Sequence, residues 1–111
     1  MDSRFNTPLE TERLRAESLK VRADAIRTRI QAALNICNLI ETQVDWGEIE
    51  KARVGMPKVW HAIEEIRRHI DEPGHVSSGA AEELSKRLAI LELEARKVAK
   101  RLDARRDKPL P

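Results

Sequence analysis

The chain has 111 residues, of which 41% are hydrophobic and 36% are charged, with three aromatic rings, four glycines and five prolines. Its formal net charge is only +2, so the overall charge favours neither a polyanionic partner nor an acidic tail. The low glycine and proline content excludes a collagenous or low-complexity chain, and no apolar run is long enough for a membrane span. The abundance of Ala, Leu, Glu, Lys and Arg predicts long helices within one domain.

The first predicted helix begins at Pro8. Thr7 supplies an N-cap hydroxyl, Pro8 suits the first helical position because its missing N–H costs nothing there, and Glu10 is placed to bond back to the cap. Apolar residues then follow alternating steps of three and four, as in a heptad repeat: Leu9, Ala16, Leu19, Ala23, Ile26, Ile30, Ala33, Cys37, Ile40 and Val44. This core row predicts a helix over 8–44.

A second helix is predicted over 46–72. The residues Asp45 to Glu48 combine an acidic cap with a helix-poor glycine, which indicates the first turn. The core row that follows keeps strict steps of three and four: Ile49, Ala52, Met56, Val59, Ile63, Ile66 and Ile70. It passes through Pro57, which removes one backbone donor, and the unbroken phase favours one kinked helix over two separate helices.

The third helix is predicted over 78–107, after a break between Asp71 and Gly79 that is rich in Pro, Gly and Ser. Its core row is Ala81, Leu84, Leu88, Leu91, Ala95, Val98 and Leu102. Short connections make consecutive helices antiparallel, so we expect an all-α, up-down-up antiparallel three-helix bundle with a long first helix and coiled-coil-like packing. A single domain over 8–107 would then lie between an N-terminal tail, 1–7, and a frayed C-terminal tail, 108–111.

The first helix carries a second uncharged row opposite its core row: Leu14, Ser18, Val21, Ala25, Thr28, Ala32, Asn35 and Leu39. The row is compatible with the broad apolar stripe of an ordinary bundle, or with a helix that packs on a second copy of the chain. We favour self-association in a two-fold antiparallel arrangement. The predicted dimer interface is Leu14, Val21, Ala25, Ala32 and Leu39, and Ile90 and Leu93 on the third helix offer another face.

The C-terminal segment Arg96 to Lys108 contains seven basic and two acidic residues, a net charge of +5. Cations near a helix C-terminus complement the helix dipole, and they also bind phosphates. Possible phosphate or partner contacts are Arg96, Lys97, Lys100, Arg101, Arg105 and Arg106. No aromatic residue follows Trp60 to stack on a base, so a solvated or protein-facing surface is favoured over nucleic acid.

Catalytic chemistry is not indicated. The glycines are scattered, which excludes a nucleotide-binding loop, and Cys37 lies on the core row, where burial suppresses thiol reactivity. His61, Glu65 and His69 share one helix face and could hold a metal, but a ladder of solvated charge pairs is the default there. We therefore expect no catalytic, cofactor-binding or metal-binding residues and no enzymatic activity.

The expected function is that of a non-enzymatic interaction or self-assembly module, with a homodimer or a helical protein as partner and no membrane. The alternative is a small protein that binds nucleic acid through the basic end of the third helix. A single cysteine and the absence of an apolar signal segment near the first residue predict a cytoplasmic protein.

Overall fold

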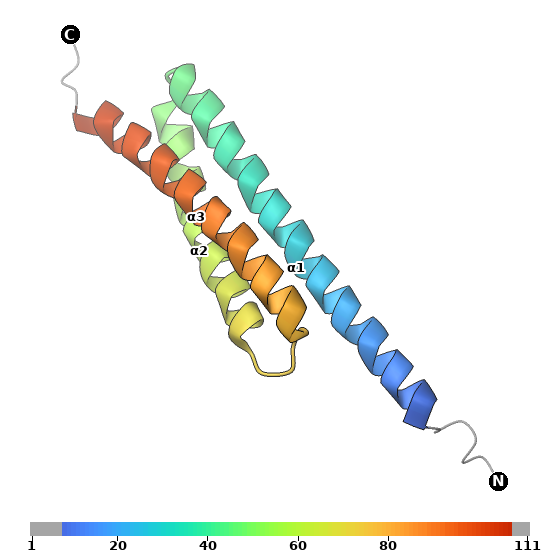
Figure 1. Ribbon diagram of the computed structural model, residues 1–111. Coiled ribbons are helices and arrows are strands. Elements are labelled where there is room, and N and C mark those ends of the chain that lie inside the picture. Colours follow the sequence, from blue (N-terminus) through green and yellow to red (C-terminus); the bar gives the residue numbers. More distant parts are fainter. Residues whose placement is uncertain (1–7, 108–111) are drawn as a thin grey trace.

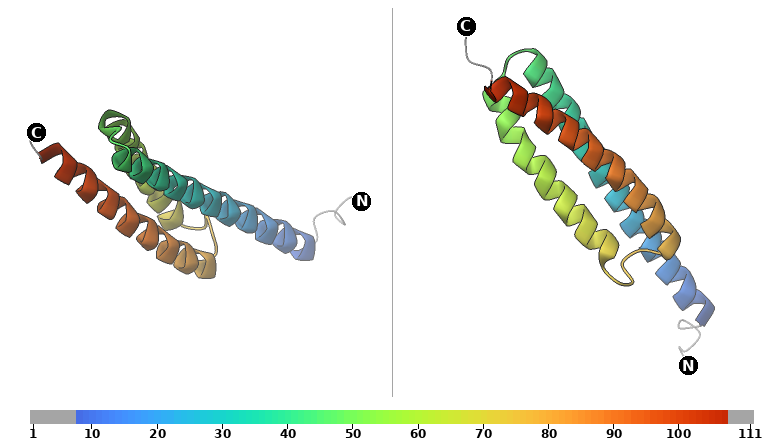
Figure 2. Two further views of the ribbon diagram at one scale, coloured as in Figure 1. Left: turned by 90° about the horizontal axis from the view of Figure 1, so that it is seen from above. Right: turned by 60° about the vertical axis from the view of Figure 1, so that its left-hand side comes forward.

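The protein is a bundle of three helices. The computed structural model describes the backbone of residues 8–107 and the side chains of residues 9–105, so the predicted tails lie outside the described residues. Helix α1 spans Pro8–Asp45, α2 spans Ile49–Asp71 and α3 spans Ser78–Asp107. They run up, down and up, and each packs against the other two (Figures 1 and 2). This confirms the predicted all-α bundle with a long first helix.

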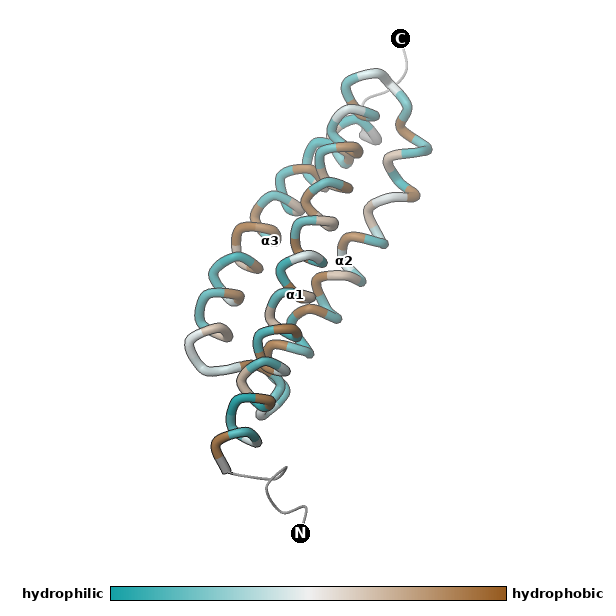
Figure 3. Tube along the Cα trace, turned by 90° about the vertical axis from the view of Figure 1, so that its right-hand side faces the viewer, coloured by the Kyte–Doolittle hydropathy of each residue, from teal (hydrophilic) through white to brown (hydrophobic). Residues whose placement is uncertain are grey.

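The core is built from the three predicted core rows. Apolar positions recur along each helix at the predicted spacing (Figure 3), and in all three helices the central members of the row are buried. The largest fully buried side chains come from every helix and include Ile26, Ile40, Ile66, Leu84 and Leu91. Heptad spacing therefore identified the inward faces correctly, because residues three and four apart lie on one side of a helix.

The N-terminal part of α1 extends beyond the other two helices (Figure 1). α1 has 38 residues, compared with 23 in α2 and 30 in α3. The first buried residue of α1 is Ala23, whereas Leu9 and Ala16, which the core row placed inside, are exposed. The exposure of Leu9 agrees with the excess length expected of the first helix, whereas the assignment of Ala16 to the core was wrong. α2 and α3 do not reach that far, so the apolar row continues with no helix of the same chain to cover it. We call residues 8–22 the overhang.

The connection between α1 and α2 differs from the prediction. α2 begins at Ile49 and not at residue 46, because Trp46 and Gly47 form the turn that follows α1. Gly47 adopts a left-handed φ of 79°, its N–H donates to the Val44 carbonyl at 3.1 Å, and the Glu48 N–H donates to the Gln43 carbonyl at 2.7 Å. These two bonds form a Schellman motif, which satisfies the last carbonyls of α1.

α2 continues through Pro57 as one helix, as predicted. Two residues earlier, Gly55 lies against α1: a Cβ atom at this position would be only 2.9 Å from both Cγ1 and Cδ1 of Ile40. Glycine therefore allows a close approach of the two helices here, at a cost in helix propensity.

Candidate functional site

The predicted dimer interface is a continuous exposed surface on α1. We call it the outer strip, and its members are Leu14, Val21, Ala25, Ala32 and Leu39. All five are exposed; the exposed fractions of the three large residues are 62% for Leu14, 67% for Val21 and 55% for Leu39. At 3.6 residues per turn, the strip is centred about 140° around the helix from the core row. The structure thus places these residues together, on the side of α1 that faces away from the bundle core.

Some polar side chains in and beside the strip form hydrogen bonds within α1. Thr28 Oγ1 donates to the Asp24 carbonyl at 3.1 Å, and Gln31 Nε2 donates to Asn35 Oδ1 at 3.0 Å. Covering them with another helix would not break these two bonds, which lowers the cost of burying the Thr28 hydroxyl and the Gln31–Asn35 pair. This surface is therefore suited to burial.

The two edges of the outer strip carry opposite charges. We assign Ser18, Ala25, Ala32 and Leu39 to heptad position a, and Leu14 and Val21 to position d. From residue 10 onward, every e position as far as residue 29 is then an arginine, and every g position as far as residue 24 is acidic. The e residues are Arg15, Arg22 and Arg29, and the g residues are Glu10, Glu17 and Asp24. The sequence analysis above missed this pattern, which steps of seven residues would have shown.

The side chains on these edges lie at or near the surface. Arg15, Glu17, Asp24 and Arg29 are exposed, and Arg22 is half-buried with an Nε atom that has no hydrogen-bond partner among the described residues. Asp24 contacts Arg27 of its own helix through Oδ1, at 2.5 Å. A carboxylate has two oxygens and about four lone-pair sites, so this contact still allows Asp24 to accept a further hydrogen bond.

Two arginines at the basic end of α3 contact the C-terminal end of α1. Arg101 forms an ion pair with Asp45, and Arg105 donates to the Val44 carbonyl at 3.3 Å. α1 has no basic residue in its own last turn, so these two arginines of α3 complement the negative end of its dipole.

The other predicted phosphate contacts are less engaged. Arg96 is 3.6 Å from Glu92 of its own helix. Lys97 and Lys100 are exposed and have no ion-pair partner among residues 9–105, and the side chain of Arg106 lies outside the described part. Among the described residues of the predicted basic patch, two lysines and one weakly paired arginine are therefore left to contact phosphates or a partner.

A pair of carboxyl groups meets between α1 and α3, beside Cys37. A side-chain hydrogen bond with Glu94 raises the pKa of Glu41, and burial and the negative charge of Glu94 act in the same direction, against the opposing charge of Arg101. Burial also raises the pKa of the Cys37 thiol to about 11, with smaller contributions from Glu94 and Glu41. Cys37 is therefore a protonated thiol at neutral pH, as expected for a core position.

The histidines are not arranged as the helix-face pattern suggested. His61 Nε2 lies 3.9 Å from Glu65, but the third member of that trio, His69, stacks on His75 with ring centroids 5.1 Å apart. The His, Cys, Asp and Glu side chains that converge within the described region are instead His69, Glu72 and His75. Sequence analysis missed this group because His75 follows the end of α2 and only a turn brings it back.

No family model matches this chain, and no curated protein or solved structure is significantly similar to it. Within residues 8–107, no helix is both long and apolar enough to cross a membrane. The proposals below therefore depend on the residues of this chain alone.

Proposed function

We propose that this protein is a non-enzymatic self-assembly module that forms a homodimer through the outer strip of α1. The observation that carries the proposal is the combination of an exposed apolar strip with edges of opposite charge at heptad spacing. Heptad positions from residue 11 to residue 39 cover four heptads, which is enough for a two-stranded coiled coil. The partner that matches both edges at once is a second copy of the same helix.

The edge charges favour a parallel dimer over the antiparallel arrangement expected at first. In a parallel pair each g residue faces the e residue five positions later on the partner, which brings Glu17 next to Arg22 and Asp24 next to Arg29. In an antiparallel pair e residues face e residues and g residues face g residues. Arginine would then face arginine and carboxylate would face carboxylate, which is repulsive.

Parallel pairing also gives the overhang a neighbour. The overhang exposes Leu14, at 62%, and no helix of its own chain packs against most of it (Figure 1). A parallel partner lies along the whole of α1, so the two overhangs would support each other. Small residues at Ala25, Thr28 and Ala32 would let the two helices approach closely in the middle of the contact.

The oligomeric state provides the first test. Light scattering at tens of micromolar chain should give about twice the chain mass. Ala25→Glu with Ala32→Glu should give a folded monomer, because four charges per dimer would enter the contact. Ala89→Glu with Ala104→Glu is the matched control, since both alanines are exposed on α3 and should leave the dimer intact. A monomeric wild-type protein would contradict the proposal. A dimer that survives the α1 substitutions would also contradict it, and would indicate an interface at Ile90 and Leu93 of α3.

Disulfide trapping tests the orientation. In a Cys37→Ala background, Ser18→Cys places one thiol per chain at an a position of the overhang. A parallel dimer brings the two thiols together and should cross-link on mild oxidation. An antiparallel dimer centred on the strip would place Ser18 opposite Asn35. In that case only a mixture of Ser18→Cys and Asn35→Cys chains would cross-link. Such a result would refute the parallel arrangement.

Charge reversal tests the edges themselves. Arg22→Glu with Arg29→Glu should weaken the parallel dimer by at least about tenfold, because attractive pairs become repulsive. Mixing these chains with Glu17→Arg, Asp24→Arg chains should restore dimers, since every facing pair is again attractive. Lys97→Glu with Lys100→Glu is the control, because both lysines lie on α3. If the wild-type protein dimerises no more tightly than the variant with Arg22→Glu and Arg29→Glu, the edge charges do not stabilise the dimer.

Nucleic-acid binding by the basic end of α3 is the second candidate. The exposure of Lys97 and Lys100 supports it, whereas the engagement of Arg101 and Arg105 with α1 reduces the charge available for phosphates. Retention on heparin and binding to duplex DNA or RNA should fall steeply with salt if these lysines contact phosphates. The variant Lys97→Glu with Lys100→Glu should then lose binding, and no salt-dependent binding by the wild-type protein rejects this candidate.

A further inference from the structure

The turn between α2 and α3 brings three metal-binding side chains together. His69 lies in the last turn of α2, Glu72 is its C-cap residue, and His75 follows in the turn. Their ligand atoms all lie within 4.8 Å of one another, and His75 Nδ1 is 3.4 Å from a carboxylate oxygen of Glu72. This cluster does not depend on the dimer or on the outer strip.

The local sequence explains why the cluster forms. Gly74 has a φ of 74°, Pro73 precedes it, and the His75 N–H donates to the Glu72 carbonyl at 3.1 Å. These are the features of a type II β-turn, which suits Pro followed by Gly at its two central positions. The turn places its first and last residues, Glu72 and His75, side by side.

Packing holds the second histidine in place. Val76 is buried in the core, with only 8% of its surface exposed, so the residue next to His75 is anchored. The His75 ring stacks on the His69 ring with an interplanar angle of 25°, and the His75 side chain is only 21% exposed. Both imidazoles are therefore half-buried and are held at short range by the fold.

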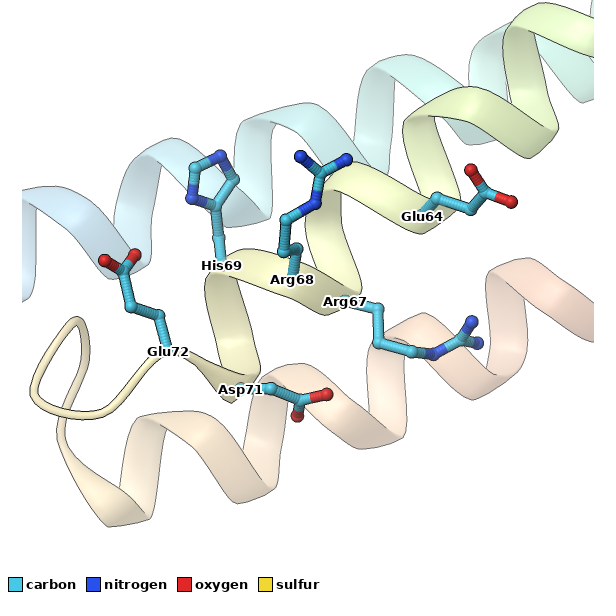
Figure 4. Close-up of a pocket in the computed structure, with 6 residues that line it drawn as sticks. All are labelled: Glu64, Arg67, Arg68, His69, Asp71 and Glu72. Atoms are coloured by element: carbon cyan, nitrogen blue, oxygen red, sulfur yellow. The ribbon is translucent and has the colours of Figure 1, made fainter.

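The helix dipole and the nearby side-chain charges act in opposite directions on a cation at this cluster. The cluster lies at the C-terminal end of α2, where the helix dipole is negative. Figure 4 shows His69 and Glu72 projecting from the same side of α2, together with Arg68, while Arg67 and Asp71 project from a different side. Arg67 forms an ion pair with Glu92 of α3, whereas Arg68 projects from the same side as His69 and Glu72, where its positive charge opposes a bound cation.

We propose that His69, Glu72 and His75 bind a divalent transition-metal ion of the zinc class. Two imidazoles and one carboxylate form a ligand set typical of zinc sites that keep a fourth position open for water. Ligands around a tetrahedral zinc at about 2.0 to 2.1 Å lie about 3.4 Å from one another, so ligand atoms that now lie within 4.8 Å of one another have to close by up to about 1.4 Å. The two stacked imidazole rings also have to turn until both nitrogen lone pairs face the ion. The bound ion would tie the end of α2 to the turn that leads into α3.

Calorimetric titration of the full chain with Zn²⁺ tests this site. We expect one ion per chain, and a rise in the thermal unfolding midpoint that a chelator reverses. His69→Ala and His75→Ala should each weaken binding by at least about tenfold and abolish the thermal shift, and Glu72→Gln should weaken it too. Thermal unfolding without zinc checks that each variant is folded.

His61→Ala is the matched control, because His61 is a histidine of α2 that lies outside the cluster. It should bind Zn²⁺ as the wild-type protein does. If His61→Ala loses as much affinity as His75→Ala, the ion is not held by the turn. If the wild-type protein shows no zinc binding at micromolar concentrations, or if His75→Ala keeps full affinity, the proposal is wrong.

Discussion

The contact between Gly55 and Ile40 predicts that a substitution that improves helix propensity will nevertheless destabilise the protein. Gly55→Ala would gain up to about 1 kcal/mol from helix propensity alone. The new Cβ would lie 2.9 Å from two side-chain atoms of Ile40, which is well inside ordinary van der Waals contact. Ile40 is only 1% exposed, so its side chain has little room to move, and overpacking of this kind costs about 1 to 3 kcal/mol. We expect a net loss of up to about 2 kcal/mol.

Urea unfolding followed by circular dichroism measures this change in the free energy of unfolding. Gly79→Ala is the matched control, because Gly79 is also helical and its Cβ would meet no atom within 4 Å. That variant should be as stable as the wild-type protein or more stable.

A double-mutant cycle isolates the steric term. Ile40→Ala alone should cost about 2 to 5 kcal/mol, but it removes both atoms that the new Cβ would meet. Adding Gly55→Ala to that background should therefore stabilise the protein. If Gly55→Ala stabilises the wild-type protein, or if its effect is the same in both backgrounds, the close approach of α1 and α2 does not determine the choice of glycine.

Four further predictions concern stability and reactivity. The raised pKa of Glu41 means that the folded state binds a proton more tightly than the unfolded chain, so the free energy of unfolding should fall as the pH rises above 4.5. Glu41→Gln should reduce that fall. In urea titrations at pH 7 this variant should be more stable than the wild-type protein. Ile63→Ala should cost about 2 to 5 kcal/mol, because Ile63 is 2% exposed; a loss below about 0.5 kcal/mol would contradict the core assignment. Pro57→Ala should leave the free energy of unfolding unchanged or raise it, since it restores a helical donor; a loss above about 2 kcal/mol would show that the fixed φ of proline is needed. The Cys37 thiol, with a pKa of about 11, should react with iodoacetamide at pH 7 only in urea, and alkylation of the native protein at the same rate would refute its burial.

Sequence periodicity alone was sufficient to predict the helices and their inward faces. Steps of three and four placed Ile30, Ile63 and Leu91 in the core, and all three are buried. This works because helical geometry is local: the face on which a residue lies depends only on its distance along the chain. The outer strip was predicted for the same reason. The charged edges, which include Arg22 and Asp24, could have been predicted too, because heptad spacing places them beside the strip.

Contacts between residues far apart in the sequence could be identified only in the tertiary structure. Ala16 has the spacing of a core residue but is exposed, because the ends of the neighbouring helices decide whether a row is covered. Arg101 belongs to a basic run that suggests phosphate binding, but it pairs with Asp45 of α1. The stacking of His75 on His69 depends on a turn at Gly74 that reverses the chain. Local spacing carries no information about such contacts, because each is set by where two separate segments meet in space.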